Sequence, residues 1–229
     1  MTCGIIIAAA GQGKRMGLGI NKQLIELNHK PILIHTLERF RDKPWVDQIV
    51  VVAHPDELDI IGKLVCDYRI TVKALVPGGK ERQESIANGL NFIDTDYVMV
   101  HDGARPFVSD RLLEELHKEV QSFSAVVPGV PVKETIKVVS EDHLIEQTPE
   151  RKGLWAVQTP QAFRVPLLKE AYQFAKETAF TGTDDSSLVE KLGYQVKVLI
   201  GDYNNIKITT PEDLLLAQVI LDNWGDKLC

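Results

Sequence analysis

The feature that most constrains the fold is an alternation of short, continuously apolar segments with longer amphipathic ones. The apolar segments, rich in β-branched residues, are 4–8, 48–53, 71–76 and 97–101, and helical spacing is found at 31–40, 84–92 and 110–120. Strands that are apolar along their whole length belong to parallel sheets that are covered on both faces. The sequence therefore predicts an α/β fold with a mostly parallel sheet and helices on both faces.

The alternation is interrupted after Pro131. Residues 135–139 and 144–147 are short alternating segments joined by a polar turn, which predicts a β-hairpin. A two-stranded ribbon is only marginally stable alone, so we expect it to pack against a partner chain.

The pattern of helices and strands then returns at 165–176 and 195–199. Thr210 and Pro211 predict the N-cap and first turn of a last helix. We expect a single domain over residues 1–229, with a protruding β-arm at about 133–155.

The composition favours a soluble protein of the cytoplasm. The formal net charge is −6, which gives no bulk attraction to nucleic acid or to an anionic membrane. The N-terminus lacks the features of a signal peptide, and the apolar runs are far shorter than the ~20 residues that span a bilayer. Cys3, Cys66 and Cys229 lie far apart, which favours reduced thiols over disulfides or a metal site.

A glycine-rich loop, Ala8-Ala-Ala-Gly-Gln-Gly-Lys-Arg-Met16, follows the first apolar segment. Glycines at the carboxyl end of a strand let backbone N–H groups converge on an anion. The dinucleotide fingerprint is excluded because Met16 replaces its third glycine. The P-loop is excluded because Arg15 follows the lysine, and no glycine lies five residues before Gly13. The loop alone leaves open a nucleotide-phosphate site and an ordinary strand-to-helix turn.

The segment Tyr97–Phe107 carries a stronger signal. Its apolar strand ends at Asp102, at the edge where open α/β sheets bind ligands. Mg²⁺ usually takes one or two carboxylates together with phosphate oxygens and water. A single Asp at such a place can also be a loop or helix cap, but its position after the phosphate loop favours a Mg²⁺ ligand.

Together with these two segments, four others resemble the 2-C-methyl-D-erythritol 4-phosphate cytidylyltransferase family. They are residues 77–85, 131–135, 151–161, and 183–185 with 205–207. The resemblance extends from Ile5 to Asp213. It implies a Rossmann-like nucleotidyltransferase fold that transfers CMP from CTP to 2-C-methyl-D-erythritol 4-phosphate with the help of Mg²⁺. Pyrophosphate and 4-diphosphocytidyl-2-C-methyl-D-erythritol would be the products, within the non-mevalonate isoprenoid pathway.

The resemblance also implies the roles of individual residues. Arg15 and Lys22 would be catalytic and would stabilise the charge at the α-phosphate. The residues that would bind CTP are Ala8, Ala9, Ala10, Gly11, Gly13, Gly78, Gly79, Lys80 and Ser85. Those that would surround the acceptor are Asp102, Arg105, Thr135, Arg151, Thr159, Thr183 and Lys207, and Asp102 would also hold the metal.

Thr135 and Arg151 lie on or beside the predicted arm. The resemblance implies that this arm crosses a two-fold axis and completes the site of the partner in a homodimer. Two positions depart from the family pattern: Lys80 stands where many relatives carry an acid, and Glu134 replaces the more usual Asp.

Two other functions stay open on the sequence. A ribitol-5-phosphate cytidylyltransferase would have another polyol phosphate in the same pocket, although residues 151–163 favour methylerythritol phosphate. A non-catalytic nucleotide-binding regulator could use the same scaffold. Such a regulator would be expected to lack charge at Arg15, Lys22, Asp102 or Lys207, and all four residues are present.

Overall fold

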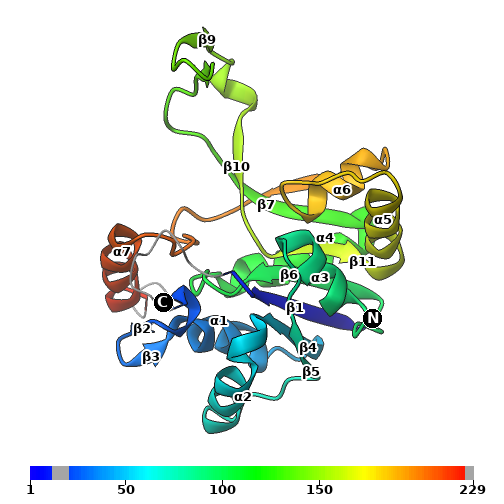
Figure 1. Ribbon diagram of the computed structural model, residues 1–229, viewed down its shortest axis with the longest axis vertical. Coiled ribbons are helices and arrows are strands. Elements are labelled where there is room, and N and C mark those ends of the chain that lie inside the picture. The colour runs from blue at the N-terminus through cyan, green and yellow to red at the C-terminus, as the bar shows by residue number, and fades with distance from the viewer. Residues whose placement is uncertain (12–20, 225–229) are drawn as a thin grey trace.

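The computed structural model describes residues 1–11 and 21–224 (Figure 1). Its centre is an eight-stranded sheet. The strands are β1 (Cys3–Ala9), β4 (Val46–Ala53), β5 (Ala74–Pro77), β6 (Tyr97–Asp102), β7 (Ala125–Pro131), β10 (Trp155–Val157), β11 (Gln161–Arg164) and β12 (Lys197–Ile200). Their order is β10-β7-β11-β6-β1-β4-β5, and β12 pairs with β7.

The sheet is mostly parallel, as predicted. β1 runs parallel to β4 and β6, β4 to β5, and β7 to β12. The exceptions are β11, which is antiparallel to both β6 and β7, and β10, which is antiparallel to β7. The sequence pattern does not predict β7, β10 or β11. β7 carries Pro128, Gly129 and Pro131, which are typical of turns, and β10 and β11 are only three and four residues long.

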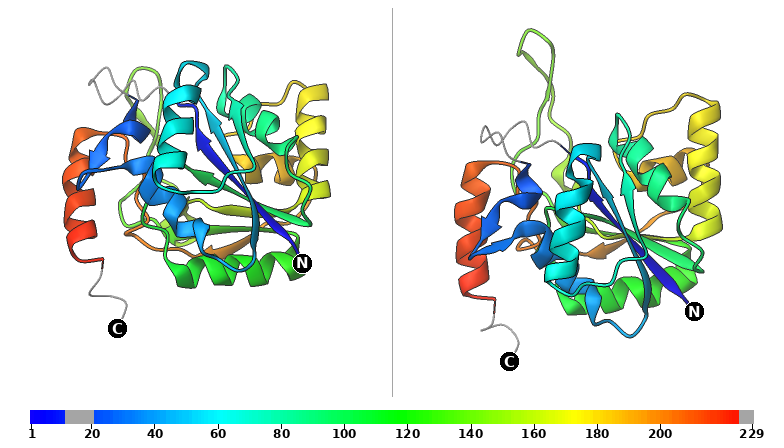
Figure 2. Two further views of the ribbon diagram at one scale, coloured as in Figure 1. Left: turned by 90° about the horizontal axis from the view of Figure 1, so that it is seen from below. Right: turned by 60° about the horizontal axis from the view of Figure 1, so that its bottom comes forward.

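Helices cover both faces of the sheet, which confirms the prediction (Figures 1 and 2). The first face holds α1 (Ile32–Arg41), α2 (Leu58–Asp67) and α4 (Asp110–Phe123), and the second holds α3 (Arg82–Leu90), α5 (Val165–Glu177) and α6 (Asp185–Lys191).

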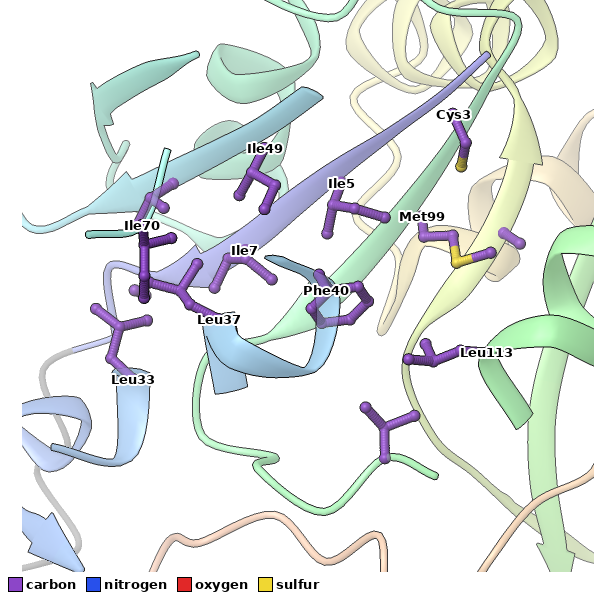
Figure 3. Packing of buried hydrophobic residues seen from close by; sticks show 14 of the residues in the cluster. Cys3, Ile5, Ile7, Leu33, Leu37, Phe40, Ile49, Ile70, Met99 and Leu113 are labelled. Carbon is purple, nitrogen blue, oxygen red and sulfur yellow. The ribbon is translucent and has the colours of Figure 1, made fainter. Parts of the chain in front are cut away.

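Successive residues of β1 point to opposite faces of the sheet. Ile5 and Ile7 pack with Leu37 and Phe40 of α1 (Figure 3), whereas Ile6 belongs to the second cluster and lies against α3. This double burial explains why the strand is apolar throughout.

The predicted hairpin is confirmed. β8 (Val138–Val139) and β9 (Ile145–Gln147) are antiparallel, and His143 adopts a left-handed conformation in the turn between them (φ 61°). The arm stands clear of the sheet and its helices (Figures 1 and 2). Its apolar side chains are exposed, among them Leu144 (68%) and Ile145 (63%).

The last helix, α7 (Pro211–Asp222), begins as predicted. Thr210 accepts from the Asp213 N–H and Asp213 accepts from the Thr210 N–H, which forms a capping box. The helix packs near a small hairpin of β2 (Glu26–Leu27) and β3 (Lys30–Pro31). The remaining elements are the 3₁₀ turns η2 (Lys22–Leu24), η3 (Pro55–Glu57) and η4 (Arg151–Gly153). Within the described ranges, no helix combines the length and the apolar character needed to cross a membrane.

Candidate functional site

A cavity of about 940 Å³ opens where β1, β4, β5 and β6 reach their carboxyl ends. This is the edge at which parallel α/β sheets bind ligands. Its lining residues are Ala8, Ala10, Gly11, Lys22, Gln23, His54, Pro55, Gly78, Gly79, Lys80, Glu81, Arg82, Glu84, Ser85, Asp102, Ala104 and Lys207.

The cavity brings together most of the residues predicted to bind CTP. Of that set, Ala8, Ala10, Gly11, Gly78, Gly79, Lys80 and Ser85 line it, as do Lys22, Asp102 and Lys207. Ala9 does not, because its side chain is fully buried in the core on the other side of β1. Gly13 and Arg15 lie outside the described residues.

The loop after β5 is held close to the end of β1. A Cβ on Gly78 would lie 2.4 Å from the Ala10 Cβ, so only glycine fits there. The Ser85 hydroxyl accepts from the Gly79 N–H at 3.0 Å and donates to the Glu81 carbonyl at 3.0 Å. Ser85 therefore shapes the loop that lines the cavity.

Asp102 lies among three cations at the end of β6. Its Oδ2 is 3.1 Å from Arg105 Nε and 3.0 Å from Lys207 Nζ, and its Oδ1 is 3.9 Å from Arg82 Nε. Burial by itself would raise the pKa of Asp102, but attraction to Lys207, Arg105 and Arg82 outweighs burial and holds that pKa well below its usual value. The carboxylate is therefore ionised at neutral pH.

The ligand atoms available at Asp102 fit a metal ion that takes most of its ligands from outside the protein. Within the described part of the chain, no group of three or more His, Cys, Asp or Glu side chains gathers into a metal site. Oδ1 of Asp102 accepts no hydrogen bond from a described residue, and its ion-pair partner Arg82 Nε lies 3.9 Å away, beyond hydrogen-bond distance. One available carboxylate oxygen fits Mg²⁺ that is bound mainly by nucleotide phosphates and water.

A buried chain of hydrogen bonds fixes the backbone at Asp102. The Asp102 N–H donates to Thr159 Oγ1 at 3.0 Å, and Thr159 Oγ1 lies 3.0 Å from His101 Nδ1. His101 Nε2 lies 2.9 Å from the Arg105 carbonyl, which can only accept. Burial lowers the pKa of His101 to about 4, so the ring is neutral, with its proton on Nε2 and Nδ1 accepting from the Thr159 hydroxyl. His101 therefore shapes this turn.

Two residues predicted to touch the acceptor support Asp102 in this structure. The Thr159 side chain is buried and its hydroxyl is occupied by Asp102 and His101. Arg105 donates to Asp102 Oδ2 and, from Nη1, to the Asn205 carbonyl at 2.8 Å. Neither residue lines the cavity.

Three other predicted acceptor residues lie away from this cavity. Thr135 and Arg151 are exposed on the arm, where Arg151 Nη1 donates to the Lys133 carbonyl at 2.7 Å. Thr183 is exposed in the segment between α5 and α6. Within one chain, the described structure does not bring these three residues to the cavity.

Sequence reasoning missed several residues of the cavity, chiefly Arg82, Gln23 and His54. Arg82 lies inside the 77–85 segment that carried part of the family resemblance, and its charge was an available signal. His54 directly follows β4, so its position at a strand's carboxyl end could also have indicated it.

Comparisons with known proteins identify the family. The family model described as "IspD: 2-C-methyl-D-erythritol 4-phosphate cytidylyltransferase" matches residues 3–223. A Geobacillus thermodenitrificans protein with the same name is 51% identical over 218 residues, which are 94% of this chain and 95% of that one. A protein of that name from Halalkalibacterium halodurans is 49% identical over 223 residues, with 96% and 97% covered.

Solved structures agree with this assignment. The 4-diphosphocytidyl-2C-methyl-D-erythritol synthase from Anaerococcus prevotii superposes with a TM-score of 0.84 at 32% identity, and 96% of this chain and 98% of that chain are covered. The 2-C-methyl-D-erythritol 4-phosphate cytidylyltransferase from Thermus thermophilus gives 0.80 at 31% identity, with 97% and 100% covered. The predicted resemblance and the Rossmann-like α/β fold are thereby confirmed, and this chain belongs to the 2-C-methyl-D-erythritol 4-phosphate cytidylyltransferase family of nucleotidyltransferases.

Proposed function

We propose that this protein transfers CMP from CTP to 2-C-methyl-D-erythritol 4-phosphate, which forms 4-diphosphocytidyl-2-C-methyl-D-erythritol and releases pyrophosphate. The observation that carries the proposal is the cavity at the carboxyl ends of the parallel strands, which is lined by Asp102 and by the cations Lys22, Arg82 and Lys207. Membership of the family favours this reaction over the ribitol phosphate alternative and over a non-catalytic regulator.

The protein contributes to this reaction by positioning the two substrates and by stabilising the charge of their phosphates. An oxygen of the acceptor phosphate attacks the α-phosphorus of CTP, the bond to the β-phosphate oxygen breaks, and pyrophosphate leaves in line. The acceptor phosphate is already ionised near neutral pH, so no general base is required. This agrees with the state of His101, which is neutral and has both ring nitrogens hydrogen-bonded within the protein.

Cationic side chains around the phosphates would lower the barrier. Lys22 is largely buried, so its charge acts in a region where little water screens it. We assign Lys22 and Arg15 to the charge that develops at the α-phosphate, and Lys207 to the acceptor phosphate. Each is expected to contribute about 3 kcal/mol, the scale of one preorganised donor.

Asp102 would hold Mg²⁺ through the oxygen that no described hydrogen bond uses. When bound, the ion supplies neutralisation of phosphate charge. The chain's own contribution is to keep this carboxylate ionised and in place, through Arg105, Lys207 and the Thr159 hydroxyl.

We further propose a homodimer in which the arm completes the site of the partner. The exposed apolar side chains of the arm, including Leu144 and Ile145, support this, because such a surface is stabilised by burial. The position of Thr135 and Arg151 away from the cavity of their own chain supports it too. We also propose a cytoplasmic location, which the unpaired Cys3 and Cys66 support.

A panel of acceptors tests the reaction. Purified protein with CTP and Mg²⁺ should release pyrophosphate with 2-C-methyl-D-erythritol 4-phosphate and not without it. Faster release with ribitol 5-phosphate would overturn the acceptor assignment, and no release with either would favour the regulator.

A matched pair of variants tests whether turnover occurs in this cavity. Lys22→Met removes a cation from the lining, whereas Lys63→Met removes an exposed cation of α2 outside it. Turnover should fall about 100-fold in the first variant only. Equal rates in the two variants would contradict the role of Lys22.

A further inference from the structure

The guanidinium of Arg82 lies between two carboxylates that come from distant parts of the chain. Its Nη2 is 2.6 Å from Asp185 Oδ2, and its Nε is 3.9 Å from Asp102 Oδ1. Asp102 is the last residue of β6 and lines the cavity. Asp185 is the first residue of α6 and does not line it. One side chain thus connects the cavity to a helix that does not line it.

Asp185 holds Arg82 firmly. Its side chain is fully buried, and the Tyr172 hydroxyl of α5 donates to its other oxygen, Oδ1. A buried carboxylate is stable only if it is paired and hydrogen-bonded, so Asp185 requires the Arg82 charge where it is. The guanidinium therefore has a fixed place from which its Nε side faces Asp102.

The neighbouring residue, Gln83, binds the segment that leads into α6 and makes no contact with Asp102. Gln83 Nε2 donates to the Phe180 carbonyl at 3.2 Å, and the Gly182 N–H donates to Gln83 Oε1 at 3.0 Å. Side chains of the first turn of α3 therefore hold residues 180–185 in place, and this segment includes Thr183. Arg82 and Gln83 share this task, but only Arg82 adds the contact with Asp102.

We propose that Arg82 is a positioning residue for the acceptor, because it sets the distance between the Asp102 carboxylate and the segment 180–185. This inference rests on the proposed transferase reaction. Arginine suits the role because its planar fork offers separate edges to two carboxylates. The ammonium of lysine is a compact point charge on a flexible stem, without the rigid fork that keeps two carboxylates at a fixed spacing.

The test compares Arg82→Lys with Gln83→Ala as the matched control. Lysine still neutralises Asp185, so the fold is retained, and melting curves check this. The KM for 2-C-methyl-D-erythritol 4-phosphate should rise about tenfold in Arg82→Lys, while the KM for CTP changes by less than about twofold. Gln83→Ala removes two hydrogen bonds to the segment but keeps the Arg82 pairs with Asp185 and Asp102, so it should change the acceptor KM by no more than about twofold.

A second variant tests the ion pair between Asp185 and Arg82. Asp185→Asn keeps an acceptor for the Tyr172 hydroxyl but removes the charge that holds Arg82. It should raise the acceptor KM as Arg82→Lys does, and the double variant should be no worse than either single one, because both remove the same link. An additive double variant, or equal effects of Arg82→Lys and Gln83→Ala, would overturn the inference.

Calorimetric binding of the acceptor separates this inference from the proposed function. If the wild-type protein is active and Arg82→Lys has the same acceptor KM and binding constant as wild type, the positioning role is refuted and the transferase proposal stands. If wild type binds the acceptor without turnover, the transferase proposal fails, and the binding constants of the same variants still decide the role of Arg82. If wild type neither binds nor turns over, both proposals fail.

Discussion

Lys207 Nζ lies 3.0 Å from Asp102 Oδ2, although Asp102 ends a core strand and Lys207 belongs to the irregular segment before α7. The pair joins the cavity floor to the C-terminal part of the chain. Lys207 is partly exposed (36% of its side chain), so its side of the pair is open to a ligand, whereas Asp102 is buried.

Replacing Lys207 by Met should therefore affect the acceptor more than the fold. We expect kcat/KM for 2-C-methyl-D-erythritol 4-phosphate to fall about 100-fold, the scale of one lost donor to a phosphate. The midpoint of urea unfolding should fall only slightly, because Arg105 still pairs with Asp102. Lys197→Met is the control, because Lys197 pairs with Glu119 outside the cavity. Equal kcat/KM in both variants would remove Lys207 from the acceptor site.

Thr159→Val should lower stability, because the structure uses the hydroxyl internally. The change keeps the shape of the side chain but leaves the buried Asp102 N–H without an acceptor. We expect the free energy of unfolding to fall by about 1–3 kcal/mol in urea titrations. Thr178→Val, which removes an exposed hydroxyl bonded to the Phe174 carbonyl, should cost less. A Thr159 variant with a raised acceptor KM and unchanged stability would favour the direct contact predicted from the sequence.

The buried ring of His101 predicts a loss of stability in mild acid. Its pKa is about 4 in the folded protein and 6.5 in the reference state, so the unfolded chain binds the proton first as the pH falls. The stabilisation is complete above the unfolded pKa and is lost as the pH falls from there toward 4. Between about pH 7 and about pH 5 the loss should be roughly 2 kcal/mol, measured by urea unfolding.

The matched comparison uses His101→Gln, which cannot titrate. Its free energy of unfolding should depend less on pH than that of wild type over this interval. His35 and His117, whose pKa values are also lowered by burial, contribute in the same direction in both proteins. Parallel pH curves for the two proteins would show that His101 is not the group responsible.

The shared site predicts rescue by mixing two inactive proteins. Arg151→Ala removes an arm residue, and Lys207→Ala removes a cavity residue. In a mixed dimer both changes fall in one site and the other site is intact, so random mixing should restore about a quarter of wild-type turnover. A mixture of Lys22→Ala and Lys207→Ala, both in the cavity of their own chain, should restore nothing. Failure of the first mixture, with exchange of subunits verified, would show that the arm does not cross.

The sequence predicted the parts of the fold that depend on local patterns. β1 is apolar throughout because both of its faces are buried, and α7 begins at Thr210 because its capping groups are neighbours in the chain. The hairpin at β8 and β9 was predictable for the same reason. Segment motifs also indicated Asp102, Lys22 and Lys207 before any geometry was known.

Only the tertiary structure decided which side chains meet. The hydroxyl of Thr159 reaches the Asp102 backbone because β11 inserts antiparallel between β6 and β7 and leads that residue past the end of β6. Arg82 acquires its second carboxylate because the fold brings Asp185, the first residue of α6, to the first residue of α3. Periodicity and capping report on residues that are close in sequence, whereas an ion pair or a buried hydrogen bond depends on which elements the packed core places side by side.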